Sequence, residues 1–446
     1  MHIVVVGLNL TNPSTVGMPV EILREKNLYL PGQPTHFNQE LKDWHVPIMY
    51  KQIQEEASYA ARRKAVTNFN EKHKWKKRGL ALVPTKFGIS FTALFLNQAG
   101  ALVHLYHDGS VLVAHGGTEM GQGLHTKYVF IIIYHSSSKH LISTRMTMIA
   151  AEALGVPLSD VHISETGTNT VPNTSSTAAS ASSDLNGYAI ANACTILNTR
   201  LAPYRSKLGP DAPLKELVHA AYFDRVSLSA TGFYKTPDIG YTWGPNTGQM
   251  FFYFTQGVAI AEVEIDTLTG DWTCLRADVK MDIGRSINPS IDYGQIEGAF
   301  IQGMGLFTME ESLWYRGGPM AGQLATRGPG TYKIPGFRDI PQEFNVSMLK
   351  GVKWENLQTI QRSRGVGEPP LFLGSSVFFA IRDALKAARA QYGVAATPGE
   401  DRKGDGLLSL ESPATVERIR TACVDPIVRR CVVRPREGEK SFFVAI

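Results

Sequence analysis

The chain has 446 residues, of which 43% are hydrophobic and 19% charged, and its formal net charge is +5. This length predicts two or more packed subdomains rather than one ordinary domain. The small net charge gives no argument for nucleic-acid binding, and no apolar run of about 20 residues would span a membrane. The four cysteines form no CxxC pair and suit a reducing compartment.

Two pairs of segments carry hairpin signals. Residues 101–107 and 110–115 alternate in hydrophobicity and flank Asp108-Gly109, a dipeptide typical of a two-residue hairpin loop. Residues 259–266 and 271–281 form a second pair of strand-like runs. Both pairs predict antiparallel strands.

Helices are predicted at residues 184–202, capped by Asp184, and at residues 376–392, ended by Gly393. The second helix has an apolar stripe made of Val377, Phe378, Ile381, Leu385 and Ala388. Antiparallel sheets covered by helices indicate an α+β fold of stacked layers.

The last part of the chain changes in composition. Residues 395–407 are rich in glycine, proline and charge and predict a linker. Residues 415–433 then suggest a short helix followed by a strand.

A glycine-rich stretch at residues 116–123 follows a predicted strand and precedes a helical pattern. Backbone N–H groups at such a turn can cradle an anion, and the Gln122 amide adds a donor. Taken alone this signal is weak, because the dinucleotide and P-loop patterns are both absent.

A second stretch, residues 365–370, reads Gly-Val-Gly-Glu-Pro-Pro. The glycines allow the backbone to pass close to a bulky ligand, and the prolines restrict the chain that follows. Glu368 is therefore a candidate general base. The alternative is a proline-rich surface turn with a solvated glutamate.

Together GGTEMGQGLHTK and GVGEPPLFL resemble the C-terminal molybdenum-cofactor region of the xanthine dehydrogenase/aldehyde oxidase family. Further segments resemble the family in the same order: residues 24–41, 75–92, 163–180, 261–271, 288–308 and 327–335. The likeness covers about residues 16–395, except for one segment, and residues 442–446.

The resemblance implies layered sheets with covering helices and a division of the chain into parts. These are an unmatched extension at 1–15, the tail of a first cofactor subdomain at 16–90, a second cofactor-binding subdomain at 91–395, and a linker and tail at 396–446.

The resemblance also implies roles for particular residues. Glu368 resembles the catalytic general base, and Gln122 resembles the glutamine that contacts the molybdenum oxo ligand. The residues implied to bind the molybdenum–molybdopterin cofactor are Gly117, Gln122, the small-residue turn Ala178, Ala179 and Ser180, and Gln295. The pterin dithiolene holds the metal, so no protein ligand to molybdenum is expected.

Two neighbouring residues favour a purine substrate. Phe91 and Thr92 resemble the pair with which xanthine dehydrogenases stack on a flat heterocycle and bond its polar edge. Hypoxanthine and xanthine are thus the expected substrates, and urate is the product. Phe91 could instead be a core aromatic. An aldehyde or nicotinate hydroxylase of the same superfamily, and a non-catalytic cofactor-binding or dimerisation fragment, are the alternatives.

The family's electron route needs parts that this chain lacks. Two [2Fe–2S] clusters held by four thiolates each require more cysteines than the four present. We expect the clusters and FAD, which pass electrons to NAD, to belong to an upstream part of a longer enzyme. The resemblance also implies a homodimer in the cytoplasm, or alternatively in the peroxisome.

The sequence departs from the family in two places. Residues 1–15 have no counterpart, which suggests a misplaced initiator. Residues 128–145 interrupt a helix that would read from Lys127 directly into Met146, and back-translation permits splice signals at both boundaries. We interpret this segment as a retained short intron; a tolerated surface loop is the alternative.

Overall fold

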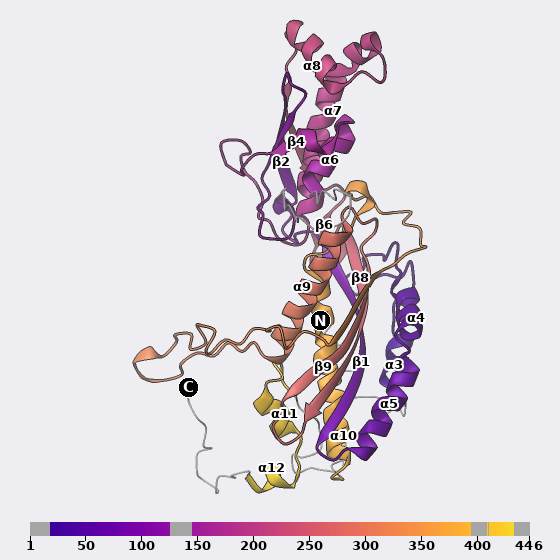
Figure 1. The fold of residues 1–446 in the computed structure, drawn as a ribbon, viewed down its shortest axis with the longest axis vertical. Coiled ribbons are helices and arrows are strands. Elements are labelled where there is room, and N and C mark those ends of the chain that lie inside the picture. The colour runs from indigo at the N-terminus through magenta and orange to yellow at the C-terminus, as the bar shows by residue number, and fades with distance from the viewer. Residues whose placement is uncertain (1–17, 125–144, 394–407, 409, 432–446) are drawn as a thin grey trace, which may run out of the picture.

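A computed structural model of the chain describes residues 18–124, 145–393, 408 and 410–431. The extension at 1–15, the predicted linker at 395–407 and all but the last residue of the predicted insertion at 128–145 lie outside these residues. The described chain forms two lobes stacked along the long axis of the molecule (Figure 1).

The lower lobe is built on a four-stranded sheet with the order β1-β8-β9-β10. Neighbouring strands are antiparallel except β10, which is parallel to β9. The strands are β1 (Lys76–Ile89), β8 (Tyr253–Asp266), β9 (Trp272–Asp282) and β10 (Glu343–Met348).

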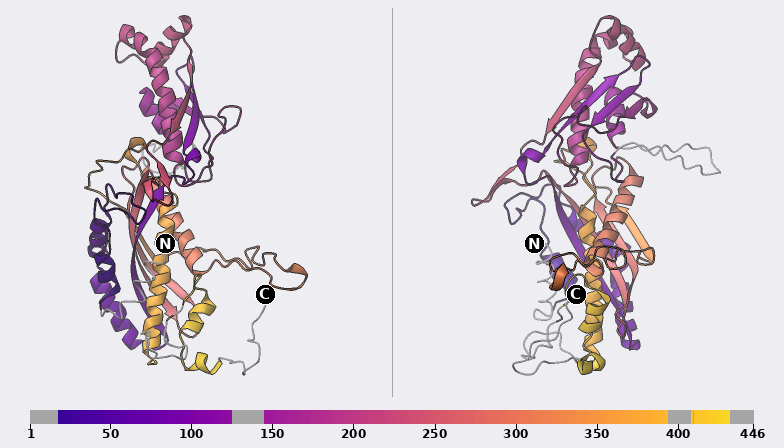
Figure 2. Two further views of the ribbon diagram at one scale, coloured as in Figure 1. Left: turned by 180° about the vertical axis from the view of Figure 1, so that it is seen from behind. Right: turned by 90° about the vertical axis from the view of Figure 1, so that its left-hand side faces the viewer.

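Helices cover both faces of this sheet (Figures 1 and 2). One face carries α3 (Val20–Lys26), α4 (Val46–Glu56) and α5 (Tyr59–Lys72). The other carries α9 (Pro289–Thr308), the 3-10 helix η5 (Pro369–Gly374), α10 (Ser375–Ala390) and α11 (Val416–Ala422). Alternation along β1 explains the two cores, because Leu80 and Leu82 pack in one and Ala81 and Val83 in the other.

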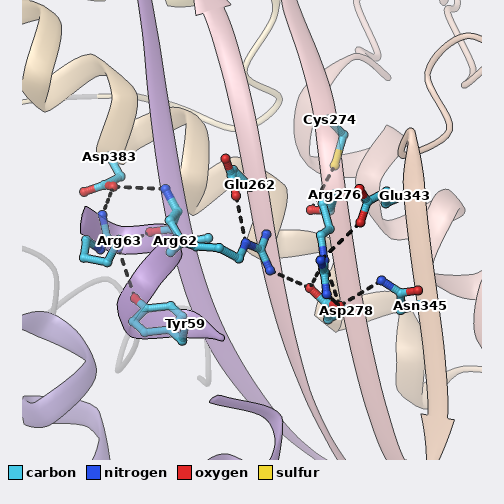
Figure 3. A network of polar contacts seen from close by, with 11 residues as sticks. Tyr59, Arg62, Arg63, Glu262, Cys274, Arg276, Asp278, Glu343, Asn345 and Asp383 are labelled. Atoms are coloured by element: carbon cyan, nitrogen blue, oxygen red, sulfur yellow. Dashed lines mark hydrogen bonds and ion pairs between the residues drawn. The ribbon is translucent and has the colours of Figure 1, made fainter. Parts of the chain in front are cut away.

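Charged side chains join α5 to the sheet beneath it (Figure 3). Arg62 donates to Glu262 at 2.8 Å and to Asp278 at 2.6 Å, on strands β8 and β9. Arg276 of β9 also bonds Asp278 and pairs with Glu343 of β10 at 3.1 Å. The network therefore ties three neighbouring strands to the helix that covers them.

The upper lobe has a second four-stranded sheet with the order β4-β3-β2-β5. Its strands are β2 (Gln98–Leu105), β3 (Val111–His115), β4 (Val161–Ile163) and β5 (Ser229–Lys235). Its helices are α6 (Arg145–Leu154), α7 (Ser182–Leu208) and α8 (Leu214–Phe223), with the 3-10 turns η1 (Leu94–Leu96) and η2 (Leu158–Asp160). The core of the lobe lies between the sheet and α7.

The remaining elements are short. A two-stranded ribbon of β6 (Gly240–Thr242) and β7 (Thr247–Gln249) precedes β8, and η4 (Ile360–Arg362) precedes the second glycine-rich stretch. Between α9 and β10 the chain, which includes η3 (Gly318–Met320), runs outward as an arm (Figure 1).

Both predicted hairpins are confirmed. The pair β2 and β3 is antiparallel, but its loop is longer than the two residues expected, since the Tyr106 N–H bonds the Ser110 carbonyl at 2.9 Å. Gly109 has φ +91°, which suits a three-residue loop that ends in a left-handed residue. Strands β8 and β9 pair with a register shift between Glu262 and Val263.

The predicted helices exist with changed ends. The first, α7, begins at Ser182 and continues to Leu208, so Asp184 lies inside its first turn and is not the N-cap. Asp184 is instead buried and accepts hydrogen bonds from outside the helix. The second is α10, whose predicted apolar stripe is buried throughout.

Residues 415–433 are predicted to form a short helix and then a strand; α11 is the short helix, but a second helix follows it, and residues 432–433 lie outside the described residues. Residues Pro426–Cys431 form α12, whose start is held by the Asp425 carboxylate accepting from the N–H groups of Ile427 and Val428. Aspartate before proline is a helix-start signal, which explains why a helix begins here. None of the described helices is long and apolar enough to cross a membrane.

Candidate functional site

A cavity of about 520 Å³ lies where the two lobes meet. The upper lobe contributes the glycine-rich loop and the turn before α7, and the lower lobe contributes α9 and the segment before η5. The lining residues are Met120, Gly121, Gln122, Leu124, Thr177, Ala178, Ser180, Ser182, Ser183, Gly294, Gln295, Gly298, Ala299, Gln302, Gly365, Val366, Gly367 and Glu368. Within the described residues, no three His, Cys, Asp or Glu side chains are grouped to hold a metal ion.

The segment that carries Glu368 is held by hydrogen bonds to both the N–H and the carbonyl group of Gly365. The Gly365 N–H donates to the Tyr253 hydroxyl oxygen at 2.8 Å, and the buried Thr255 hydroxyl donates to the Gly365 carbonyl at 2.7 Å. A side chain at this position would place its Cβ 2.3 Å from the Ser180 carbonyl oxygen. Glycine is therefore required by the close approach of the two lobes.

Ser180 binds Glu368 through two hydrogen bonds. The Ser180 hydroxyl accepts from the Glu368 N–H at 2.9 Å and donates to the Glu368 carboxylate at 2.9 Å. Ala179 and Ser180 both have left-handed φ angles, +56° and +51°. Glu368 is exposed on the cavity wall, but its carboxylate is anchored, which differs from a freely solvated surface glutamate.

The glycine-rich loop at 116–123 differs from the expected open cradle. The Glu119 carboxylate accepts from the N–H groups of Gly121 and Gly123 at 2.9 and 3.0 Å, so the loop binds its own anion. The Gln122 amide donates to the Thr118 carbonyl at 2.8 Å and accepts from the Met120 N–H. Gln122 reaches the cavity wall, although its amide is engaged within the loop.

The cavity brings together five of the predicted site residues, namely Gln122, Ala178, Ser180, Gln295 and Glu368. Gly117 and Ala179 lie beside it without lining it; a Cβ on Gly117 would be 2.4 Å from Leu124.

Phe91 and Thr92 do not line the cavity either. Phe91 is half-buried against the core of the upper lobe, where Asn97 bonds both its N–H and its carbonyl. Thr92 is exposed. The half-buried position of Phe91 fits the alternative that it is a core aromatic. Contact of Phe91 or Thr92 with the substrate stays a prediction.

Helix α9 contributes residues that the motifs did not single out. Gly294, Gly298 and Gln302 recur at every fourth position and face the cavity beside Gln295. A Cβ on Gly294 or Gly298 would meet no atom within 4 Å, so neither glycine is required by packing. Glycines inside a helix lower its stability. Two of them four residues apart were therefore the sequence signal that this face of α9 has a role other than packing.

A buried ionic cluster lies behind the Glu368 segment. Asp282 accepts from His45 at 2.8 Å and from Trp354 at 3.0 Å, and it pairs with Arg364 at 3.0 Å. Burial opposes ionisation of Asp282, but Arg364, His45 and the Gly284 N–H together hold the pKa of this carboxyl below its usual value. Arg364 directly precedes Gly365 in the chain.

Comparison with known proteins assigns the chain to a family. The family model of the molybdopterin cofactor-binding domain matches residues 52–135 and 142–341, so the chain belongs to that family. This confirms the predicted resemblance.

Two curated relatives come from Emericella nidulans. A xanthine dehydrogenase is 72% identical over 96% of this chain, and a nicotinate hydroxylase is 56% identical over 97% of it. The chain spans 29% of the length of each relative. Among solved structures, quinoline 2-oxidoreductase from Pseudomonas putida 86 shares the fold, with a TM-score of 0.71 at 22% identity, covering 93% of this chain and 51% of that one.

Proposed function

We propose that this chain is the molybdenum–molybdopterin-binding part of a purine hydroxylase in which Glu368 is the general base. The observation that carries the proposal is the Glu368 carboxylate, anchored by Ser180 on the wall of a cavity that also presents Gln122 and Gln295. The relative at 72% identity, a xanthine dehydrogenase, supports the purine assignment.

The cavity fits a large flat cofactor. Gly294 and Gly298 leave open space along α9, and the side chains of Gln295 and Gln302 offer amide donors and acceptors to a pterin. Ala178 adds a small side chain on the opposite wall. When bound, the group supplies the redox centre and the oxygen that is passed to the substrate.

The chain's own contribution to the reaction is proton transfer and orientation. Glu368 accepts a proton at its carboxylate, which faces the cavity and is accessible from it. Ser180 holds that carboxylate and the Glu368 backbone, so the base needs little reorganisation before it acts.

A nicotinate hydroxylase is the second candidate. The relative of that name aligns with nearly the whole chain at 56% identity, and Phe91 and Thr92, which favoured purines, lie away from the cavity. Activity of the full-length enzyme on hypoxanthine, nicotinate and a bulky aldehyde separates these candidates from an aldehyde oxidase. A third candidate is a non-catalytic fragment that binds the cofactor without turnover.

The rest of the proposed enzyme lies in a longer protein. We infer that its other parts hold the [2Fe–2S] clusters and FAD and pass electrons to NAD. The proposal includes a homodimer located in the cytoplasm, or in the peroxisome as the alternative.

The test is Glu368→Gln in the full-length enzyme. This change keeps the size and the Ser180 contact but removes the base, so turnover should fall about 100-fold or more at unchanged cofactor content. Glu25→Gln, at an exposed carboxylate that pairs with the exposed Lys51, is the matched control and should keep full turnover. Full activity of Glu368→Gln would remove Glu368 from the mechanism.

A further inference from the structure

Three residues far apart in the sequence form a chain of hydrogen bonds behind Glu368. The Tyr253 hydroxyl donates to the Asp184 carboxylate at 2.7 Å and accepts from the Gly365 N–H at 2.8 Å. The other Asp184 oxygen accepts from the Ile360 N–H at 3.1 Å. Asp184 therefore holds one end of the segment 360–365 directly, at Ile360, and the other end through Tyr253, at Gly365.

The donor and the acceptor in each of the two Tyr253 hydrogen bonds are fixed by chemistry. A backbone N–H can only donate, so the Tyr253 oxygen must accept from Gly365, and its single proton goes to Asp184. Burial, together with the adjacent Asp184 carboxylate, raises the pKa of Tyr253 well above its usual range. The hydroxyl thus remains a donor at every pH at which the enzyme would work.

The two anchors of Glu368 come from the same place in the fold. Ser180, which bonds Glu368 directly, lies two residues before the start of α7, and Asp184 lies in the first turn of that helix. Tyr253 is the first residue of β8 in the lower lobe. Residues at the start of α7 therefore position both the Glu368 carboxylate and the backbone segment 360–365 that precedes it.

We propose that Asp184 and Tyr253 are positioning residues for Glu368, which hold the segment 360–365 so that the base faces the cavity at a fixed distance from the bound substrate. This inference rests on the proposed role of Glu368. Its physical basis is that small displacements of a catalytic group lower the rate steeply.

The test is Tyr253→Phe in the full-length enzyme. The ring is kept, but the Gly365 N–H and the Asp184 carboxylate lose their shared partner. We expect kcat to fall about 10- to 100-fold while KM changes less than about twofold and cofactor content is unchanged. Asp184→Asn should lower kcat in the same way, and the double variant should lose little more than either single one.

Tyr204→Phe is the matched control. Tyr204 lies in α7 of the upper lobe, and its hydroxyl likewise donates to an aspartate, Asp224, at 2.9 Å, but neither residue lines the cavity. This variant also loses a hydroxyl–carboxylate hydrogen bond, but it should keep full kcat. If Tyr253→Phe also lowers only stability, the pair is structural and the inference is wrong.

The outcomes for Glu368 and Tyr253 are separable. If Glu368→Gln loses turnover while Tyr253→Phe and Asp184→Asn keep it, only the positioning role fails. If Glu368→Gln keeps turnover, the proposed function itself fails. Should Tyr253→Phe not fold, Asp184→Asn still decides, because unchanged kcat in that variant contradicts the inference.

Discussion

At the scale of single residues, Ser180 is the contact that joins the two lobes at Glu368. One hydroxyl serves as acceptor for a backbone N–H and as donor to a carboxylate. Bonds to a charged group are worth more than neutral ones, about 1.5–3 kcal/mol. The loss of this hydroxyl should therefore be felt in catalysis and not only in folding.

We predict that Ser180→Gly lowers kcat/KM about tenfold, because the backbone at φ +51° suits glycine while the hydroxyl is lost. Steady-state kinetics of the full-length enzyme measure the effect. Asn173→Gly, at an exposed residue with φ +55°, makes the same backbone change without touching Glu368 and should leave kcat/KM unchanged. Equal rates for both variants would contradict the role of Ser180.

At the scale of elements, α9 combines two kinds of glycine. Gly298 faces open space in the cavity, whereas a Cβ on Gly303 would be 1.8 Å from the Leu371 carbonyl oxygen. The first glycine therefore keeps room for a ligand, and the second lets η5 pack closely against the helix.

These roles predict opposite results for two alanine substitutions. Gly298→Ala should raise the unfolding free energy by about 0.5–1 kcal/mol through helix propensity, while molybdenum content falls because the Cβ occupies cofactor space. Gly303→Ala should lower the unfolding free energy by about 1–3 kcal/mol through overpacking. Urea unfolding and metal analysis test both, and full molybdenum loading of Gly298→Ala would show that the cofactor lies elsewhere.

At the scale of the whole molecule, Asp282 bonds side chains that come from distant parts of the sequence. His45 precedes α4, Asp282 ends β9, and Arg364 and Trp354 come from the later loops. Truncating one partner of such a buried pair leaves the other charge uncompensated. That loss costs about 3–5 kcal/mol.

We predict that Asp282→Asn lowers the unfolding free energy at pH 7 by about that amount, whereas Glu25→Gln, which breaks the exposed pair with Lys51, changes it by less than about 1 kcal/mol. Because folding lowers the pKa of Asp282, its contribution is present above the ordinary value of about 3.9 and is lost as the pH falls through the lower folded pKa. The gap between wild type and Asp282→Asn should therefore narrow below about pH 4. A constant gap from pH 7 to pH 3 would exclude the assigned ionisation.

Whether a feature could be predicted from the sequence depends on whether the residues that form it lie close together in the chain. Hairpins and the α10 stripe depend on residues within one segment, so their patterns were sufficient. The motif around Glu368 is equally local, but the role of Glu368 stays a prediction. The wrong N-cap at Asp184, and the helix found at residues 426–431 within the segment predicted to end as a strand, arose where a side chain bonds backbone groups in ways that periodicity does not reveal. Division of the chain at residue 90 stays a prediction.

By itself the sequence determined the family, the α+β class and the identity of Glu368, Gln122 and Gln295 as site candidates, because short motifs carry that information. Only the tertiary structure decided that Ser180 bonds Glu368 across 188 residues and that Tyr253 reaches Gly365 across 112. It also decided which α9 glycines face empty space. Such contacts depend on how two lobes pack together, and no local pattern in either lobe specifies that packing.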